Sequence, residues 1–430
     1  MNPSRFCFVH AADLHLDTPF RGVHEIAPEI AAELREASLD AFDAIVDLTI
    51  ERQAAFLLIA GDVYDGAERG LRAQLRFRDG LARLAGKGIP SFVVHGNHDP
   101  VATGWSAISS WPTGVTIFPS ETVQVHDVVA DGHRIATVQG ISYAQTATTE
   151  NLALRFSKPD GDGLHIGLLH CNVQGVADGY DNYSPCTIDD LKRTGLDYLA
   201  LGHIHQRRVL SGEDGIGPWI VYPGNSQARS PRKTEQEPKG ALVAYVEDGR
   251  VGRVEFVACD RVRYVEVDVP IEGFNDLAEL ADALESTATE VVASASGRSV
   301  VLRAVLSGKG AVHHDLVRSE SVRELLHALR DGAPTAPFCW WDSLEDATSA
   351  PVDIDEIRRR GDFAADLLAI ADETAADVSG RYELFSNLLD GAPNAVVEAA
   401  KSMLLDEDRL SHLLERARLL ALDKVTGAES

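Results

Sequence analysis

Five short polar motifs in this chain of 430 residues each come directly after a run of apolar residues. The runs lie at Phe6–Val9, Phe56–Ala60, Phe92–His95, His165–Leu169 and Tyr198–Leu201, and they have the length and composition of buried strands. The motifs supply residue types that bind metal ions: Asp13 and His15, Asp62, Asn97 and His98, His170, and His203 and His205. Ligands in open α/β sheets collect beyond the carboxyl ends of the strands. The sequence therefore predicts an α/β fold with all five motifs along one rim.

The spacing within the motifs predicts which side chains share a metal ion. Residues i and i+2 of an extended chain point to the same side, so Asp13 can converge with His15, and His203 with His205. The carboxylate of Asp62 has two oxygens, which makes it the natural bridge between two metal ions.

The remaining two motifs assign different roles to neighbouring residues. Asn97 can coordinate through its amide oxygen, and His170 could complete the second metal site. His98 directly follows Asn97 and should point elsewhere, which suits a general acid or a group that orients a phosphate.

Each motif also has a simpler interpretation. A single histidine at a strand end is more often a hydrogen-bonded polar residue than a ligand, and a Gly-Asp pair after a strand often only makes a turn. Gly96-Asn97-His98-Asp99 is more specific, because it combines a glycine exit, two ligand types and an acid. All five motifs in this order favour a site for two metal ions that can bind a phosphate and activate water.

The rest of the chain predicts a sandwich followed by two smaller parts. β–α alternation, with helices expected at 26–53 and 70–85, continues to about residue 260. Strands at Val115–Phe118, Thr122–Val129 and Arg134–Gln139 are expected to be antiparallel and to form a second sheet facing the first. The predicted domains are residues 1–261, an α+β domain at 262–345 and a helical region at 346–430. Single helices are expected at Leu316–Leu329 and Asp355–Ala371, and further helices at 380–389 and 394–422.

Net charge limits the substrates that the chain can attract unaided. The formal charge is −26 and the pI is about 4.9, whereas nucleic-acid backbones are usually met by Lys and Arg. Several basic residues nevertheless follow the last motif and could form a local basic rim: Arg207, Arg208, Arg229, Arg232, Lys233 and Lys239. A solvated loop is the alternative interpretation of this cluster.

Cysteine usage and hydropathy indicate a cytoplasmic protein. The five cysteines are scattered and have no CxxC spacing, which is typical of reduced buried thiols. No apolar run reaches the roughly 18 residues that a membrane helix needs. The start of the chain leads into the first strand without the pattern of a signal peptide.

The motifs resemble those of the calcineurin-like metallophosphoesterases over residues 5–245. Within that superfamily, Tyr222-Pro223-Gly224-Asn225 and the nearby Lys239-Gly240 are similar to the SbcD-type DNA repair nucleases, most of all to the YhaO branch. The resemblance implies a metallophosphoesterase β-sandwich of two facing mixed sheets flanked by helices, with a smaller capping domain and C-terminal helices.

The resemblance also implies residue roles. One metal ion would be held by Asp13, His15, Asp62 and His205, and the other by Asp62, Asn97, His170 and His203. His98 would be the catalytic histidine. Part of the nuclease family has a second histidine where this chain has Asp65, which could orient a ligand histidine but cannot act as an imidazole.

The implied function is a DNA exo- or endonuclease in DNA repair that works with an SbcC-like coiled-coil ATPase. The family pattern allows a homodimer as well. The carboxylate, amide and imidazole donors favour two Mn²⁺ ions, although they leave Zn²⁺ open. A phosphoesterase for small phosphodiesters, nucleotides or lipids is the first alternative, which the acidity favours. A partner-binding scaffold is the second, which the intact ligand set argues against.

Overall fold

The structure is a computed structural model that describes residues 5–17, 28–66, 70–102, 106–176, 181–318, 320–331, 337–350, 354–377, 389 and 407–426. These residues form two compact units. Unit 1 comprises residues 1–266, 290–302 and 332–342, and unit 2 comprises residues 267–289, 303–331 and 343–430. The chain passes between the units several times, so no single cut in the sequence separates them. The domain boundaries at 261/262 and 345/346 stay predictions.

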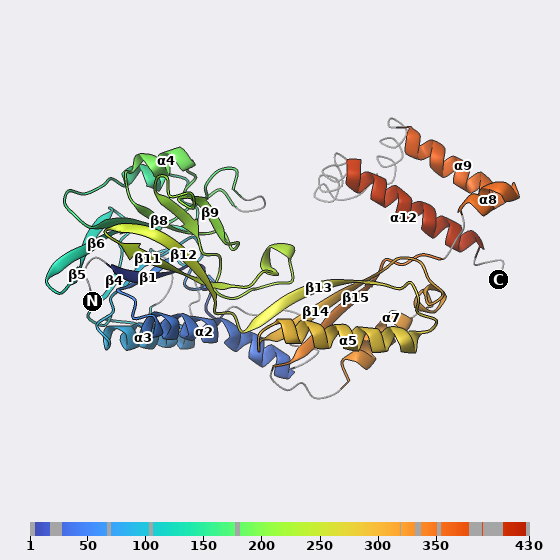
Figure 1. Cartoon of the computed structure of the whole chain (residues 1–430), viewed down its shortest axis with the longest axis horizontal. Coiled ribbons are helices and arrows are strands. Elements are labelled where there is room, and N and C mark those ends of the chain that lie inside the picture. The colour runs from blue at the N-terminus through green and yellow to red at the C-terminus, as the bar shows by residue number, and fades with distance from the viewer. Residues whose placement is uncertain are drawn as a thin grey trace. The chain divides into compact units, whose positions relative to one another are not determined.

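Two mixed six-stranded sheets form most of unit 1 (Figure 1). The order of the first sheet is β12 (Arg250–Ala258), β11 (Gly240–Glu247), β1 (Arg5–Ala11), β2 (Leu57–Ala60), β3 (Ser91–Val94) and β4 (Val115–Ile117). The order of the second is β5 (Gln124–Ala130), β6 (His133–Ile141), β7 (Leu164–His170), β8 (Tyr198–Gly202), β10 (Trp219–Tyr222) and β9 (Arg208–Ser211). Strands β1 to β4 are parallel, as are β6, β7, β8 and β10. The sandwich of two mixed sheets is thus confirmed.

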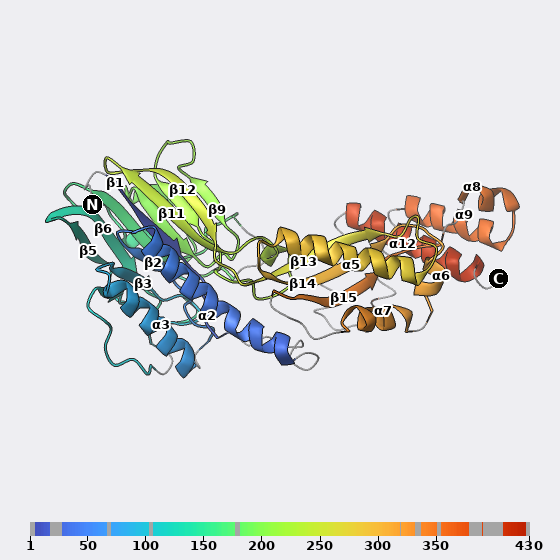
Figure 2. The same cartoon turned by 60° about the horizontal axis from the view of Figure 1, so that its bottom comes forward.

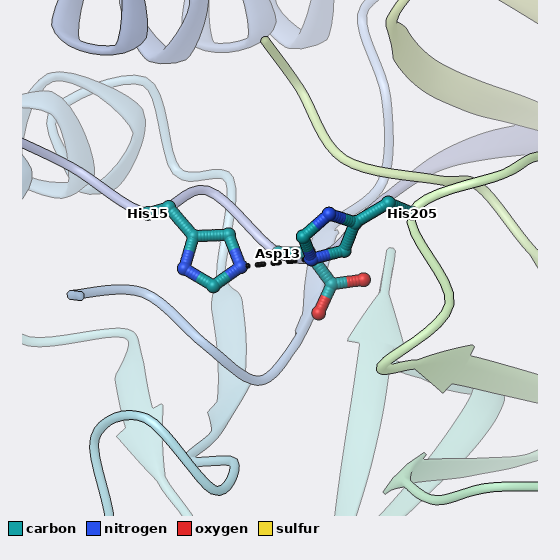
Figure 3. Close-up of side chains that lie close together, drawn as sticks. All are labelled: Asp13, His15 and His205. Carbon is teal, nitrogen blue, oxygen red and sulfur yellow. Dashed lines mark hydrogen bonds between the residues drawn. The ribbon is translucent and has the colours of Figure 1, made fainter. Parts of the chain in front are cut away.

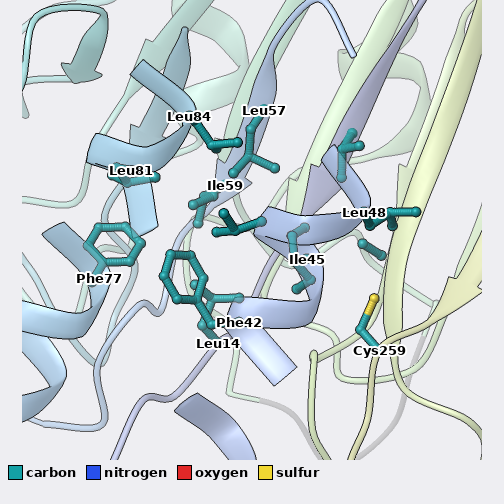
Figure 4. Packing of buried hydrophobic residues seen from close by; sticks show 14 of the residues in the cluster. Leu14, Phe42, Ile45, Leu48, Leu57, Ile59, Phe77, Leu81, Leu84 and Cys259 are labelled. Atoms are coloured by element: carbon teal, nitrogen blue, oxygen red, sulfur yellow. The ribbon is translucent and has the colours of Figure 1, made fainter. Parts of the chain in front are cut away.

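Three apolar layers hold the sandwich together. The layer between the sheets contains Phe8, Phe56 and Tyr198, all fully buried. Helices α2 (Pro28–Glu51) and α3 (Leu71–Ala85) cover the outer face of the first sheet, as Figure 2 shows. Phe42 and Phe77 from these helices pack with Leu57 and Ile59 of β2 (Figure 4). The short elements η1 (Leu152–Arg155) and α4 (Ile188–Arg193) cover the second sheet. Burial on both faces explains why these strands are continuous apolar runs.

The third sheet has the order β13 (Val262–Pro270), β14 (Ser299–Ser307) and β15 (Cys339–Asp346). Helices α5 (Leu277–Ser294), α6 (His313–Leu316) and α7 (Ser321–Leu329) lie between these strands in the sequence. The remaining described helices are α8 (Ile354–Arg360), α9 (Phe363–Ala376) and α12 (Glu407–Thr426), with Leu368 and Leu422 buried among them. No helix among the described residues is long and apolar enough to cross a membrane.

The structure corrects three of the predicted elements. The strand predicted at Val115–Phe118 is β4, which pairs parallel with β3 in the first sheet and not antiparallel in the second. The helix predicted at Leu316–Leu329 is split into α6 and α7, and Glu320 between them has a φ of 81°. The helix predicted at Asp355–Ala371 ends before Gly361, whose φ of 65° breaks it into α8 and α9. Residues 380–388 and 394–406, which belong to the last two predicted helices, lie outside the described residues.

Candidate metal centre

The carboxyl ends of five parallel strands bring the predicted ligands together. Asp13 and His15 follow β1, Asp62 follows β2, Asn97 and His98 follow β3, His170 ends β7, and His203 and His205 follow β8. The first two loops are joined by the backbone, because Asp13 N donates to Gly61 O at 3.0 Å and His15 N to Asp62 O at 3.0 Å. Because β1, β2 and β3 belong to the first sheet and β7 and β8 to the second, the rim contains residues from both sheets.

The backbone at the rim is in unusual conformations. Asp13, His15 and Asp62 have φ values of 51°, 44° and 50°, and His203 has 108°. Residues other than glycine rarely adopt a positive φ, and each such residue costs about 1–3 kcal/mol of strain. Conformations of this kind cluster at functional sites, where the surrounding structure holds them.

Glycines make room for the converging side chains. A Cβ atom on Gly61 would collide with the ring of His170, and one on Gly96 would collide with Asp62 Oδ1. A Cβ on Gly202 would collide with the carbonyl oxygen of Ala60, which is backbone and cannot rotate away. The glycine exits of the motifs are thus required by close packing and not only by turn geometry.

One half of the centre contains Asp13, His15 and His205. The Nε2 atoms of His15 and His205 face each other at 3.1 Å, with the Asp13 carboxylate beside them (Figure 3). Both Asp13 oxygens accept from the backbone N–H of His203, at 3.0 and 3.1 Å. One metal-ligand atom from each of these three side chains lies within 4.8 Å of the others, so they could hold a single cation.

The other half contains Asn97, His170 and His203. Asn97 Oδ1 lies 2.9 Å from His170 Nε2 and 3.2 Å from His203 Nδ1. The second nitrogen of each histidine donates to a backbone carbonyl: His170 Nδ1 to Ala60 O and His203 Nε2 to Asp181 O, both at 2.9 Å. In the neutral tautomers that these bonds select, the lone pairs of both rings point toward the amide oxygen.

Asp62 lies between the two halves. Its Oδ2 is 3.5 Å from His170 Nε2 and 4.0 Å from His15 Nε2. Its Oδ1 accepts from the backbone N–H of His98 at 2.9 Å. The carboxylate therefore faces both groups of histidines and also fixes the loop that carries His98.

Burial determines the protonation of these groups. It raises the pKa of Asp62 to about 6, and burial together with the Asp62 charge raises the pKa of Asp13 well above its usual range. Burial also lowers the pKa of His170 and of His203 to about 4, so both are neutral at pH 7. Metal ions bind neutral imidazoles and deprotonated carboxylates.

The arrangement fits a cation better than a network of hydrogen bonds. Two histidine lone pairs and an amide oxygen converge in one half, and two carboxylates are buried close together next to them. Buried acceptors that face each other are costly without a donor or a positive charge. Mixed nitrogen and oxygen donors suit transition metals such as Mn²⁺, Fe²⁺ or Zn²⁺ better than Ca²⁺.

The ring of His98 lies beside that of His15, with 4.9 Å between the ring centroids, and contacts Asp65. His15, Asp65 and His98 also lie close enough together to hold a cation. Its Nδ1 lies 2.8 Å from Asp65 Oδ1, and its side chain is 39% exposed. The same Asp65 oxygen is 3.6 Å from Nδ1 of the ligand His15. Burial alone would lower the pKa of His98, but the hydrogen bond to Asp65 and the charges of Asp62 and Asp65 outweigh it and raise the pKa.

Comparisons with known proteins agree with this geometry. The family model of the calcineurin-like phosphoesterases matches residues 7–207, and that of the middle domain of the metallophosphoesterase YhaO matches residues 264–349. The chain is 35% identical over 342 residues to an uncharacterized metallophosphoesterase YhaO of Bacillus subtilis, covering 79% of this chain and 81% of that protein. The chain belongs to the calcineurin-like metallophosphoesterases, in the YhaO branch.

More distant relatives of this metallophosphoesterase are repair proteins. The DNA double-strand break repair protein Mre11 of Thermoplasma acidophilum is 26% identical over 256 residues, which are 57% of this chain and 65% of that protein. Mre11 of Sulfurisphaera tokodaii is 26% identical over 223 residues, 49% of this chain and 52% of that protein. A dimetal phosphatase of Danio rerio aligns with a TM-score of 0.35 and 12% identity over 56% of this chain and 93% of its own, too weak a likeness to support any conclusion.

Two buried acids of the metallophosphoesterase support the centre from outside the predicted set. Glu235 Oε1 lies 2.8 Å from His205 Nδ1, and Glu235 Oε2 accepts from Asn225 Nδ2 at 2.7 Å. Asp99 accepts from the backbone N–H groups of Val63 at 2.9 Å and Gly96 at 2.8 Å, so it joins two ligand loops. The Gly96–Asp99 motif contained a signal for Asp99, but nothing marked Glu235 except its place between Asn225 and Lys239.

The predicted basic rim is only partly present. Lys239 is buried, and its Nζ donates to the carbonyl oxygens of His205 at 2.8 Å and Thr234 at 3.0 Å, so its assignment to the rim was wrong. Arg229 is largely buried and pairs with Asp65. The other four residues are exposed: Arg207, Arg208, Arg232 and Lys233.

Proposed function

We propose that the chain is a phosphodiesterase with two metal ions that acts as a DNA exo- or endonuclease in DNA repair. The observation that carries the proposal is the convergence of Asp13, His15, Asp62, Asn97, His170, His203 and His205 at one rim. The Mre11 relatives, named for double-strand break repair, support DNA as the substrate. A scaffold without catalysis would have no need for four non-glycine residues at positive φ in this rim.

Each residue has a defined part in this proposal. One cation is assigned to Asp13, His15, Asp62 and His205, and the other to Asp62, Asn97, His170 and His203. Two such ions supply positive charge to the phosphate and lower the pKa of a bound water. We assign Mn²⁺ to both positions on the basis of the donor types.

His98 is the proposed catalytic residue. Because its Nδ1 is held by Asp65, its Nε2 is left to face the substrate, and the raised pKa of His98 favours the protonated ring. His98 Nε2–H can then donate to a phosphoryl oxygen or to the leaving sugar oxygen. A positioned general acid typically contributes about 10²–10⁴-fold to the rate.

The test uses the full chain with Mn²⁺ on linear duplex and single-stranded DNA. We expect degradation that needs the metal and that falls about 10²–10⁴-fold in His98→Ala. The matched control is His133→Ala, because His133 is an exposed histidine at the start of β6. If every form of DNA stays intact, even with the ATPase partner present, DNA is not the substrate.

A small phosphodiester is the second candidate substrate. The net charge of −26 favours it, because an acidic surface repels a long polyanion more than a small one. Hydrolysis of a chromogenic diester by a protein that leaves all DNA intact would support this candidate.

We also propose that the C-terminal helices bind an SbcC-like coiled-coil ATPase. Phe363 and Ile370 on α9 are 70% and 61% exposed, whereas Leu368 on the same helix is buried against α12. An exposed apolar helix face suits a coiled coil as its partner. Deletion of residues 353–430 should abolish co-purification with such an ATPase, and retained binding would place the interface elsewhere. The homodimer and the cytoplasmic location remain predictions.

A further inference from the structure

Arg229 lies outside the predicted ligands but contacts the residue that holds His98. Its Nη2 is 2.5 Å from Asp65 Oδ2, while Asp65 Oδ1 is 2.8 Å from His98 Nδ1. The carboxylate is thus held on both oxygens, by a guanidinium on one side and an imidazole on the other. The side chains of Arg229 and Asp65 are only 22% and 19% exposed, so water screens this contact less than it does a surface ion pair.

This contact limits how Asp65 can move. Asp65 Oδ1 faces two imidazoles, at 2.8 Å from His98 Nδ1 and 3.6 Å from His15 Nδ1. A carboxylate with no partner on its second oxygen could rotate and change which ring it holds. The guanidinium of Arg229 occupies this second oxygen and so limits the rotation of the carboxylate.

Packing anchors the backbone next to Arg229. Arg229 Nε is buried, so this edge of the group does not face the solvent. The preceding residue, Ala228, is buried in an apolar cluster with Val262, Tyr264 and Trp340. This cluster belongs to unit 1 and joins the loop to the first residues of β13.

Gln227 adds hydrogen bonds to the same strand. Its Oε1 accepts from the backbone N–H groups of Arg261 at 2.8 Å and Val262 at 3.3 Å, and its Nε2 donates to Val262 O at 2.7 Å. Gln227 and Ala228 therefore anchor the backbone from which Arg229 extends to Asp65.

We propose that Arg229 is a positioning residue that acts on His98 through Asp65, and that Gln227 and Ala228 tie this chain of contacts to the start of β13. The inference rests on the proposed catalytic role of His98 and adds a residue to that site. Arg229 does not bind the phosphate in this proposal, which separates it from the usual role of an arginine near a phosphoryl group.

A double-mutant cycle tests the proposal with a chromogenic phosphodiester and Mn²⁺. We expect Arg229→Gln to lower kcat about 10- to 100-fold, as for other residues that orient a functional group, with KM changed less than about twofold. In a His98→Ala background, Arg229→Gln should cause no further loss, because its target is absent. Arg229→Lys, which retains the charge, should restore part of kcat. Arg232→Gln is the control, because Arg232 is exposed in the same loop.

Several results would overturn the proposal. A raised KM with unchanged kcat, or an equal loss in the His98→Ala background, would mean that Arg229 contacts the substrate directly. If His98→Ala is impaired but Arg229→Gln is not, the positioning role fails and the proposed function stands. If His98→Ala keeps full activity, the catalytic assignment fails and the positioning role fails with it.

A second measurement does not depend on turnover. Histidine ¹⁵N NMR of the metal-free protein, at a pH where the ring is neutral, should show the Nδ1–H tautomer of His98 in the wild type and a mixture of tautomers in Arg229→Gln. An unchanged His98 signal in a folded Arg229 variant would contradict the proposal, and thermal melting identifies the variants that fold.

Discussion

Glu235 illustrates what sequence motifs miss at the scale of single residues. The residues with metal-binding side chains come directly after predicted strands, which is where ligand sites of α/β sheets lie. The structure brings the ligand atoms of Asp13, Asp62 and His170 within 4.8 Å of one another. Glu235 is 30 positions away from His205 in the sequence, yet its carboxylate holds His205 Nδ1. No local pattern can predict such a partner, because only the folding of the loop after β10 places it there.

We predict that Glu235→Gln weakens Mn²⁺ binding about 10- to 100-fold, because a carboxylate behind a ligand histidine raises its basicity and fixes its tautomer. Isothermal titration of the metal-free protein with Mn²⁺ measures the change. Glu213→Gln, at an exposed position, is the matched control and should bind as the wild type does. Equal affinities in all three proteins would show that Glu235 does not support a metal ligand.

Gly202 gives a second prediction at this scale. Because a Cβ there would collide with the carbonyl oxygen of Ala60, Gly202→Ala should destabilise the fold by about 1–3 kcal/mol and also displace His203. Gly252→Ala, where a Cβ meets nothing within 4 Å, should leave the melting temperature nearly unchanged. Urea unfolding of both variants compares them, and equal stability would contradict the close packing at the rim.

At the scale of elements, the sequence predicted buried strands best. All five predicted strands that precede the motifs are present, because strands buried on both faces are continuous apolar runs. Sheet membership was harder to predict: β4 has only three residues, and its parallel pairing with β3 depends on the chain between them. Helix breaks at Glu320 and Gly361 were missed, because apolar periodicity continues across a single left-handed residue.

Helix α9 provides a prediction at the scale of elements. The double substitution Phe363→Asp and Ile370→Asp should abolish binding of an SbcC-like ATPase. The melting temperature should stay unchanged, because both side chains are mostly exposed. Leu368→Ala should instead destabilise its helices by about 2–5 kcal/mol, because Leu368 is fully buried. Ile216→Asp is the control for an exposed apolar residue in unit 1. Pull-down assays that show full binding by the double variant would remove α9 from the interface.

At the scale of the whole molecule, the acidic charge and the metal centre have to be considered together. The charge of −26 includes the carboxylates of Asp13 and Asp62, which two bound dications would offset. The exposed cations Arg207, Arg208, Arg232 and Lys233 follow the last ligand motif in the sequence. Composition alone favoured a small substrate, whereas the Mre11 relatives are named for DNA double-strand break repair.

The most direct test of the account is anomalous diffraction from crystals of the protein grown with Mn²⁺. We expect two peaks at the rim: one within coordination distance of Asp13, His15 and His205, the other within coordination distance of Asn97, His170 and His203, and both next to Asp62. His98 should contact neither ion. A single peak, or an ion bound by His98, would contradict the proposed centre and the catalytic role derived from it.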